Sequence, residues 1–402
     1  MRSTRYALIV VLAVLSVTYA YAGFWDTTIL DNSIVSGTSS GHPESSAPGV
    51  DYGLRSVALS PNQGYVYAGF MHGGGIRYIY EYSVSQTSES NNNYVARFTF
   101  NNISVPSTDP SYDNSTQIVA LAATNSYIYA GLSQEYTGVG LQGFAVVDAN
   151  LTGSTDYKVS LSLPVYGLTV DGNYLYVTED AKNGASADVQ RYTLNPSTGL
   201  PTLDTSWGSG GTLNLQTLAG GSGAGDLRGV VTDDAGNIYI ASRTDGKIYK
   251  INAAGTSVTS TSFTMPMVDD LAIYDGSLYA TEYNGTSSAI EKVSLDLAVG
   301  ITVAGPAHLY DGVYSNDAAG WNDQGGYSGL DISATGRIYM GDQYWNDTLI
   351  DGTGTAYFTD RLYGSDPLPE PGTLALFGLG IPALVGVLRR RRSAEGGAGG
   401  GE

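Results

Sequence analysis

The chain has no cysteine and few charged residues. Asp, Glu, Lys and Arg together account for 14% of its 402 residues. The absence of Cys excludes a disulfide framework, a thiolate metal site and a cysteine nucleophile. Stability must therefore come from a large packed core. Lys and Glu are scarce as well, and because both favour helices, a mainly helical protein is not expected.

Glycine and tyrosine are abundant instead. The chain contains 53 Gly and 31 Tyr. Gly supplies the positive φ angles that tight turns need, and Tyr suits the half-buried surface of a pleated sheet. The composition therefore predicts many short strands. The length would suit two average domains, but all-β barrels and propellers of this size also form single units.

The first 22 residues have the pattern of a secretory signal peptide. Arg2 and Arg5 precede an apolar run over residues 7–17, and residues 20–22 read Ala-Tyr-Ala, an A-x-A cleavage site. The shortness of the apolar run favours cleavage after Ala22 over an uncleaved membrane anchor or a buried helix. We therefore expect signal peptidase to act on the chain during export, leaving a body over residues 23–366.

The C-terminal end combines an apolar segment with a cluster of arginines. Residues 372–388 carry no charge and are at the lower limit for a membrane-spanning helix. The cluster that follows consists of Arg389, Arg390, Arg391 and Arg392. Positive charge resists translocation, so this end is expected to stay cytoplasmic while the body lies outside. Just before the span, Pro369, Glu370 and Pro371 form an extended segment that a membrane peptidase could grip.

These three parts together resemble the PEP-CTERM sorting signal of Gram-negative bacteria, which exosortase recognises. The resemblance covers residues 367–402, with a ten-residue tail after the arginines as its one departure. It implies processing by exosortase, transient anchoring in the inner membrane through the C-terminal helix, and delivery to the cell surface or an exopolysaccharide matrix. An ordinary C-terminal anchor is the alternative.

A hydrophobic residue followed by tyrosine recurs six times between the two signals. Each copy follows a short apolar strand and a turn rich in Gly, Asn or Asp, as in a hairpin. The six tyrosines are Tyr67, Tyr129, Tyr176, Tyr239, Tyr279 and Tyr339. Their spacings of 40 to 63 residues suit propeller blades with loop insertions.

We therefore predict an all-β protein with a single β-propeller, flanked by the signal peptide and the C-terminal transmembrane sorting helix. Six blades are favoured, and five or seven stay open because a long gap could hide a degenerate copy. Repeats of this kind stack around an axis, which protects their strand edges. The ring is expected to close by pairing of residues 24–30 with strands of the last blade.

The repeat over residues 227–255 resembles an NHL-type or lactonase-like propeller repeat, and residues 327–342 match its first half. Gly229 and Gly236 recur as Gly329 and Gly336 at the same offset from an Ile-Tyr pair. The resemblance implies the fold, and it does not assign an activity because one fold serves many functions.

No catalytic constellation is apparent. The histidines, His42, His72 and His308, lie far apart and lack a metal-ligand spacing. A G-x-S-x-G pattern at residues 37–41 lacks the flanking strand and helix of a nucleophile elbow. No catalytic residue is therefore assigned.

The formal net charge of −19 argues against nucleic acid as a partner. Ca²⁺ is the cofactor that loops rich in Asp and Asn would suit, but a complete calcium-binding loop motif is missing. The metal is therefore left unassigned. A solvated acidic surface that keeps an exported protein soluble is the favoured explanation of the charge.

The mouth of the propeller channel is the expected ligand site. The first strand of each blade lines the channel, so the residues that enter these strands converge at one end of it. They include Arg55, Tyr166, Arg228, Asp269, Asp270 and Tyr327. Tyr with mixed charge suits a polar ligand such as a sugar. The lactonase resemblance makes Asp269 and Asp270 the candidate metal ligands, and the simpler alternative is that these side chains only satisfy loop backbone.

Two functions follow from this pattern. The favoured one is an exported, exosortase-sorted surface or matrix protein whose non-catalytic propeller binds a ligand, a polysaccharide or a surface protein. The alternative is a metal-assisted lactonase, hydrolase or lyase at the channel mouth. Three or four carboxylate or amide groups about 2.3 to 2.6 Å from one point would favour the enzyme.

The Glu370→Ala variant tests the sorting signal. It should be exported normally but stay in the inner membrane with its tail attached, because the segment gripped by the sorting enzyme is altered. Intact-mass analysis should place the end of the wild-type surface protein near residues 369–372. Recovery of full-length tail from the surface fraction would refute processing.

Overall fold

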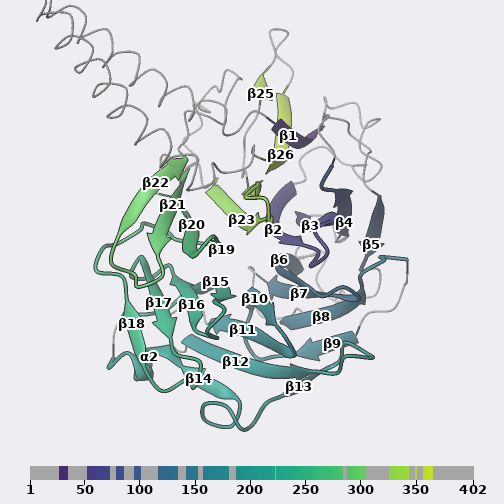
Figure 1. The fold of residues 1–402 in the computed structure, drawn as a ribbon. Coiled ribbons are helices and arrows are strands. Elements are labelled where there is room, and N and C mark those ends of the chain that lie inside the picture. Colours follow the sequence, from purple (N-terminus) through teal and green to yellow (C-terminus); the bar gives the residue numbers. More distant parts are fainter. Residues whose placement is uncertain are drawn as a thin grey trace, which may run out of the picture.

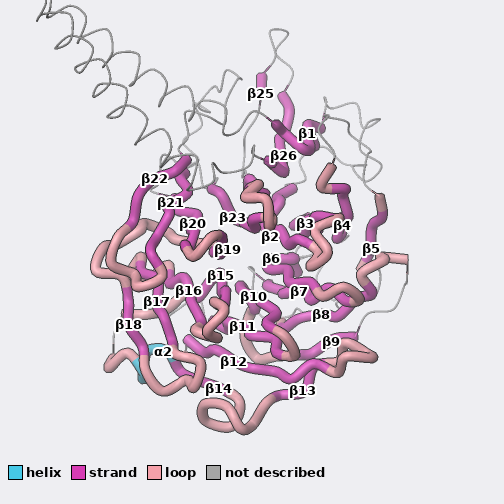
Figure 2. Tube along the Cα trace, in the orientation of Figure 1, coloured by secondary structure: helices cyan, strands magenta, loops and turns pink. Residues whose placement is uncertain are grey.

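The computed structural model describes a β-propeller. The described residues are 27–34, 52–72, 78–85, 95–100, 116–134, 142–152, 157–180, 187–221, 223–283, 288–304, 326–343, 349–350 and 356–364. Within these ranges the strands form six antiparallel sheets around a common axis (Figure 1, Figure 2). The predicted signal peptide, residues 369–371, the span 372–388 and the arginine cluster lie outside the described residues. None of the helices within the described ranges is long and apolar enough to cross a membrane.

The first three sheets follow the order of the chain. They contain β2 (Tyr52–Leu59), β3 (Tyr65–His72), β4 (Tyr78–Ser83) and β5 (Ala96–Thr99); β6 (Thr116–Ala123), β7 (Tyr127–Gln134), β8 (Gly143–Asp148) and β9 (Tyr157–Ser160); and β10 (Val165–Asp171), β11 (Tyr174–Asp180), β12 (Ala187–Leu194) and β13 (Pro201–Leu203). In the third sheet β14 (Thr212–Asn214) also pairs with β12 and leads into the four-residue helix α2 (Leu215–Leu218).

The next two sheets have the same plan, and the last is composite. They contain β15 (Leu227–Thr232), β16 (Ile238–Ser242), β17 (Lys247–Ile251) and β18 (Val258–Ser260); β19 (Leu271–Tyr274), β20 (Ser277–Tyr283), β21 (Ser288–Ser294) and β22 (Gly300–Ala304); and β23 (Gly326–Ile332), β24 (Ile338–Gln343), β26 (Ala356–Gly364) and β1 (Thr27–Ile34), with the short β25 (Leu349–Ile350) on β26.

The ring closes through β1. This strand comes from the start of the body and pairs antiparallel with β26, from Thr27 opposite Gly364 to Ile34 opposite Phe358. It is the outermost strand of the last sheet, so the two ends of the body share one blade. The inner strands β2, β6, β10, β15, β19 and β23 contact one another in sequence, and β23 contacts β2. The predicted single all-β propeller and its closing strand are confirmed.

The repeated tyrosines form the seams between neighbouring blades. They lie in the second strand of each sheet, and each is at most 3% exposed. Tyr129 in β7, for example, packs with Val165 and Leu175 of the next sheet. Tyr339 in β24 packs with Leu54 of β2, across the point where the ring closes. The sequence repeat therefore marks the contact that joins one blade to the next.

Several tyrosine hydroxyls also bind the following blade. Each donates a hydrogen bond to a backbone carbonyl just after the third strand of that blade. The described pairs are Tyr67 with Ala149 O at 3.4 Å, Tyr129 with Gly199 O at 2.9 Å, Tyr239 with Leu295 O at 3.0 Å and Tyr339 with Val84 O at 3.4 Å. A buried hydroxyl needs such a partner, because leaving it unpaired would cost about 1 to 3 kcal/mol.

Removing residues 23–34 from the mature chain should open the ring. The deletion strips β1 from the last sheet and leaves the edge of β26 unpaired, which invites aggregation. We expect the midpoint of thermal unfolding to fall by more than about 5 °C and soluble yield to drop. A chain that keeps residues 23–34 and ends at residue 366 is the control. Equal thermal midpoints would contradict closure through β1.

Candidate functional site: the mouth of the propeller channel

A β-bulge near the start of the inner strands builds one end of the channel. In β2, β6, β10, β15 and β23 the pairing register shifts at this point. A bulge leaves a residue unpaired in the ladder and re-aims its side chain, and bulges are frequent next to binding sites. The residues in this position are Arg55, Val119, Tyr166, Arg228 and Ser328.

In the fifth sheet, Asp269 holds the corresponding position two residues before β19 begins. Its carbonyl accepts a hydrogen bond of 2.7 Å from Gly229 N in the neighbouring blade. At Gly229 a Cβ atom would lie 2.5 Å from Asp270 Oδ1 and 2.7 Å from Asp270 Cα, so a larger residue would push the two inner strands apart. The recurrence of this glycine in the sequence therefore reflects a close approach between blades.

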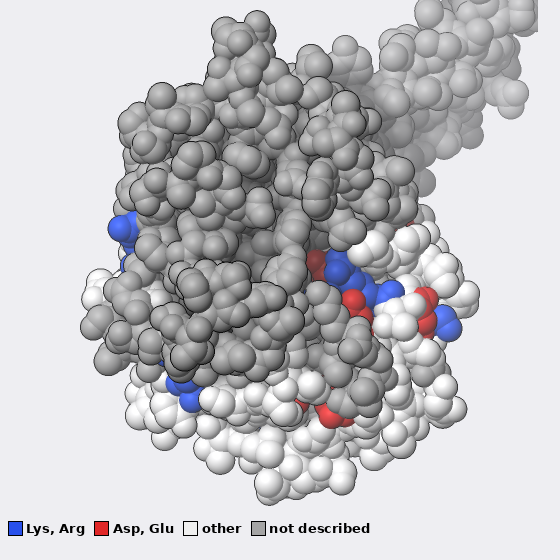
Figure 3. All heavy atoms as spheres, turned by 180° about the vertical axis from the view of Figure 1, so that it is seen from behind, with Lys and Arg blue, Asp and Glu red and all other residues white. Residues whose placement is uncertain are grey.

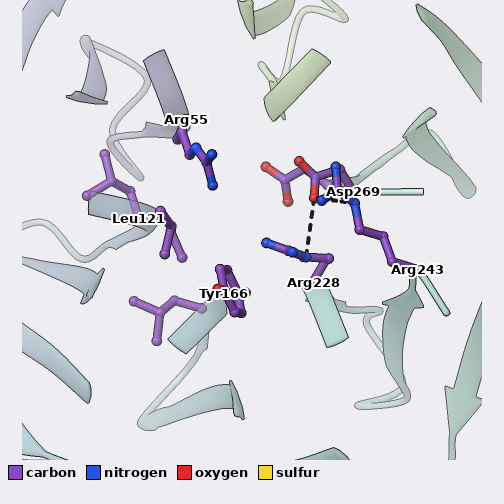
Figure 4. Close-up of a pocket in the computed structure, with 11 residues that line it drawn as sticks. Arg55, Leu121, Tyr166, Arg228, Arg243 and Asp269 are labelled. Atoms are coloured by element: carbon purple, nitrogen blue, oxygen red, sulfur yellow. Dashed lines mark ion pairs between the residues drawn. The ribbon is translucent and has the colours of Figure 1, made fainter. Parts of the chain in front are cut away.

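Five of the six predicted mouth residues line one small cavity. Its volume is about 30 Å³, and its walls include Arg55, Tyr166, Arg228, Asp269 and Asp270. Figure 4 shows the side chains of Arg55 and Arg228 reaching toward the centre from opposite blades. The geometry therefore brings together residues that lie up to about two hundred positions apart in the chain.

Tyr327 does not have the bulge position of Arg55, Tyr166 and Arg228. It pairs with Asp342, directly before the bulge, in the position that Val165 and Leu227 occupy in β10 and β15. Ser328 holds the bulge position that corresponds to Tyr166 and Arg228. The prediction of Tyr327 was therefore displaced by one residue, since the alternation of a strand does not reveal where a bulge lies.

Arg228 is held in place from three sides. Its Nη2 atom lies 2.7 Å from Asp226 Oδ1, and its Nε atom lies 3.8 Å from Asp269 Oδ1. Its guanidinium carbon lies 3.8 Å from the centre of the Tyr166 ring, which is close enough for a cation–π contact. Arg228 is only 6% exposed, so these partners compensate a charge that is largely removed from water.

Tyr166 supports this arginine and does not offer a stacking surface. The residue is 5% exposed, its ring packs against Arg228, and its hydroxyl accepts a hydrogen bond of 2.9 Å from Ser133 Oγ. The expectation that Tyr166 would present a flat face to a sugar is therefore wrong in this structure. The polar groups of the arginines are what the cavity presents.

Arg243 is a mouth residue that the sequence analysis missed. It follows β16, and its Nε atom lies 3.6 Å from Asp269 Oδ1. Burial lowers the pKa of Arg243, while Asp269 acts in the opposite direction. The overlooked signal was local. The second strands β11 and β20 have Glu179 and Glu282 as their next-to-last residues, whereas β16 ends in Ser242 and the next residue is Arg243. Charged side chains of both signs gather in one patch of the described surface seen from behind (Figure 3).

Asp270 and Asp331 join neighbouring inner strands. Asp270 accepts hydrogen bonds from Leu271 N at 2.9 Å and from Leu330 N, in the next blade, at 2.8 Å. Asp331 accepts from Ile332 N and from Leu59 N, both at 2.7 Å. We call these two residues the carboxylate clamps. They connect β19 to β23 and β23 to β2, so they hold the ring together at its axis.

The clamps also face a larger cavity along the axis. Its volume is about 270 Å³, and Asp270 and Asp331 line it. Both side chains are partly accessible through this cavity, although packed protein surrounds them on the other sides. Burial raises the pKa of Asp270 to about 8 and that of Asp331 to about 6, against the opposing effect of the backbone N–H groups.

The carboxylates of the mouth do not form a metal centre. Across the described ranges, no group of three or more His, Asp or Glu side chains is placed to hold a metal ion. Asp269 instead faces two arginines, and both oxygens of Asp270 accept backbone hydrogen bonds. The expectation that Asp269 and Asp270 would be metal ligands is therefore not supported by their geometry.

Comparison with known proteins supports the C-terminal signal. A family model described as the PEP-CTERM protein-sorting motif matches residues 367–392. The chain therefore carries this motif, as its residues had indicated. No curated protein matches the chain.

Solved structures of similar fold share little sequence with the chain. The Dos1 propeller has 12% identity and a TM-score of 0.42, covering 74% of this chain and 69% of its own. The Cps50 (Swd1) β-propeller domain of Myceliophteria thermophila has 11% identity and a TM-score of 0.41, covering 79% and 86%. A protein of unknown function from Bacteroides caccae has 11% identity and a TM-score of 0.43, covering 77% and 93%. Likenesses this distant do not indicate a ligand.

The carboxylate clamps should make the protein less stable as the pH rises. In the folded state they keep protons that an unfolded chain loses near pH 4, so the free energy of unfolding should fall from about pH 5 to about pH 8. Each group can contribute up to about 1.4 kcal/mol per pH unit within its own window. In the Asp270→Asn variant the fall between about pH 6 and pH 8 should be shallower.

Urea denaturation across this pH range measures the slope. The Asp234→Asn variant, which removes an exposed carboxyl in a turn, controls for the loss of one acidic group. Equal slopes in the wild type and in Asp270→Asn would show that Asp270 is ionised in the folded protein throughout the range.

Proposed function

We propose that this protein is an exported, surface-directed binding protein whose propeller holds a ligand at the channel mouth without transforming it. The PEP-CTERM motif implies export that depends on exosortase. Cleavage of residues 1–22, transient anchoring in the inner membrane of a Gram-negative bacterium, and a polysaccharide or surface protein as the ligand belong to the proposal.

The bulges carry the binding proposal. Five inner strands break their ladder at the same point, and the described side chains at this position, Arg55, Val119, Tyr166 and Arg228, line one cavity. Regular pairing would stabilise a ring equally well, so a bulge repeated from blade to blade indicates that the direction of these side chains matters. The buried arginine and aspartate network then fixes the side chains in one arrangement, as a preorganised site requires.

The chemistry of the mouth favours binding over catalysis. The groups around the cavity are arginines, a tyrosine whose hydroxyl is already hydrogen-bonded, and aspartates engaged by arginines or backbone N–H groups. None of these is a nucleophile next to a base, which is the usual arrangement for covalent catalysis. The same groups are well suited to holding a polar ligand in a fixed orientation.

Filling the mouth tests the proposed function whatever the charge of the ligand. Val119 is 7% exposed, lines the cavity and lies in the bulge of β6. The Val119→Trp variant should occupy the cavity and lower retention of the protein on surface material from the producing cells by at least about tenfold, as after loss of a central interface contact. Val95, which is 55% exposed beside β5, provides the control variant Val95→Trp.

Co-sedimentation with surface material stripped of the native protein measures retention, and circular dichroism verifies that both variants fold. Bound material recovered from the wild type should keep its original size. A folded Val119→Trp protein that is retained like the wild type would show that the mouth is not the binding site. Shortened material would instead favour the hydrolase or lyase alternative.

A further inference from the structure

The mouth is a basic site at the centre of an acidic protein. The chain has a formal net charge of −19, yet three arginines, Arg55, Arg228 and Arg243, line this one cavity. Asp226 pairs with Arg228, and Asp269 lies within 3.8 Å of both Arg228 and Arg243. Basic side chains therefore gather at one point of an acidic chain.

These guanidinium groups select the charge of a ligand. A dication would enter a site lined by three guanidinium groups, which opposes the calcium expectation. Asp226 and Asp269 lie beside the arginines, so a group with one negative charge meets less repulsion from them than a dianion does. Such repulsion is screened far less in a partly buried site than at the surface, which favours a monoanion.

The size of the cavity selects the chemical group. A volume of about 30 Å³ is about twice what one buried water needs. A carboxylate group fits in this space, whereas a whole sugar ring does not. The rest of the ligand must therefore lie outside the mouth, and specificity within the cavity is for one functional group.

The arginines are arranged to receive such a group. Arg228 is fixed by Asp226 and by the ring of Tyr166, and Arg55 reaches the cavity from the opposite blade (Figure 4). The Nε atom of Arg243 is buried, and within the described ranges it has no hydrogen-bond partner, since Asp269 lies 3.6 Å away. Planar guanidinium groups match the two oxygens of a carboxylate, and buried donors favour a ligand that can accept from them.

We propose that the channel mouth binds a carboxylate group, carried by a small free acid or by a sugar acid whose ring stays outside the cavity. This inference rests on the proposed binding function and specifies its ligand chemistry. The Arg55 and Arg228 guanidinium groups hold the carboxylate from opposite sides, and Arg243 adds a third donor.

Isothermal titration calorimetry of the full-length chain in mild detergent, at low ionic strength, tests this proposal. The probes are galacturonate, its neutral counterpart galactose, acetate and inorganic phosphate. Galacturonate should bind and galactose should not. Equal affinity for acetate would assign the site to small free acids, and tighter binding of galacturonate would assign it to sugar acids.

Substitution of Arg55 tests the contact directly. Arg55→Gln should weaken galacturonate binding about tenfold or more, the usual effect of losing a charge-assisted hydrogen bond. Arg55→Lys keeps the charge but loses the planar fork, so its affinity should be intermediate. Lys158→Gln in β9, the outermost strand of another blade, is the control for removal of one positive charge. Thermal unfolding verifies that each variant is folded.

The proposal is overturned if neither acid binds, if phosphate binds more tightly than galacturonate, or if Arg55→Gln behaves like Lys158→Gln. These outcomes can be distinguished from those of the retention experiment. If Val119→Trp abolishes retention while no carboxylate binds, the binding function stands and the carboxylate inference fails. If carboxylates bind but Val119→Trp is retained normally, the site exists and the proposed surface function is wrong.

Discussion

The contact of one buried tyrosine with the following blade is the interaction on which this fold depends. A single blade cannot bury both of its faces, so each must lie against a neighbour. The tyrosine ring fills that seam, and where the hydroxyl pair is described it donates to a carbonyl after the third strand of the next blade. The aromatic ring of the tyrosine thus sets the distance between neighbouring blades, and its hydroxyl sets their relative position along the propeller axis.

This fixed spacing brings the inner strands close together at the axis. Gly229 has no room for a Cβ atom beside Asp270, and Gly329 has none beside Val57 N. The carboxylate clamps accept hydrogen bonds across the β19–β23 and β23–β2 boundaries. At the β23–β2 boundary the tyrosine seam, the close approach of Gly329 and the Asp331 clamp occur together.

The packing of the blades brings the charged side chains of the mouth together. Arg55, Arg228 and Arg243 come from two blades, and Asp269 reduces the repulsion between Arg228 and Arg243 because it lies within 3.8 Å of both. The chain as a whole has a formal net charge of −19, so the three arginines concentrate positive charge at one point of an acidic protein. The PEP-CTERM motif, at residues 367–392, is separate in the sequence from the strands of the propeller.

The all-β ring of repeats, the closing strand, the sorting motif and five of the residues that line the mouth could be predicted from the sequence. Strand alternation, turn residues and repeat spacing are local properties, and a sequence shows them directly. Tertiary structure alone decided that Ser328 and not Tyr327 has the bulge register, that Arg243 enters from a second strand, and that Arg228 covers Tyr166. Each of these depends on how two strands or two blades align, and register is set by pairing partners that are distant in the chain.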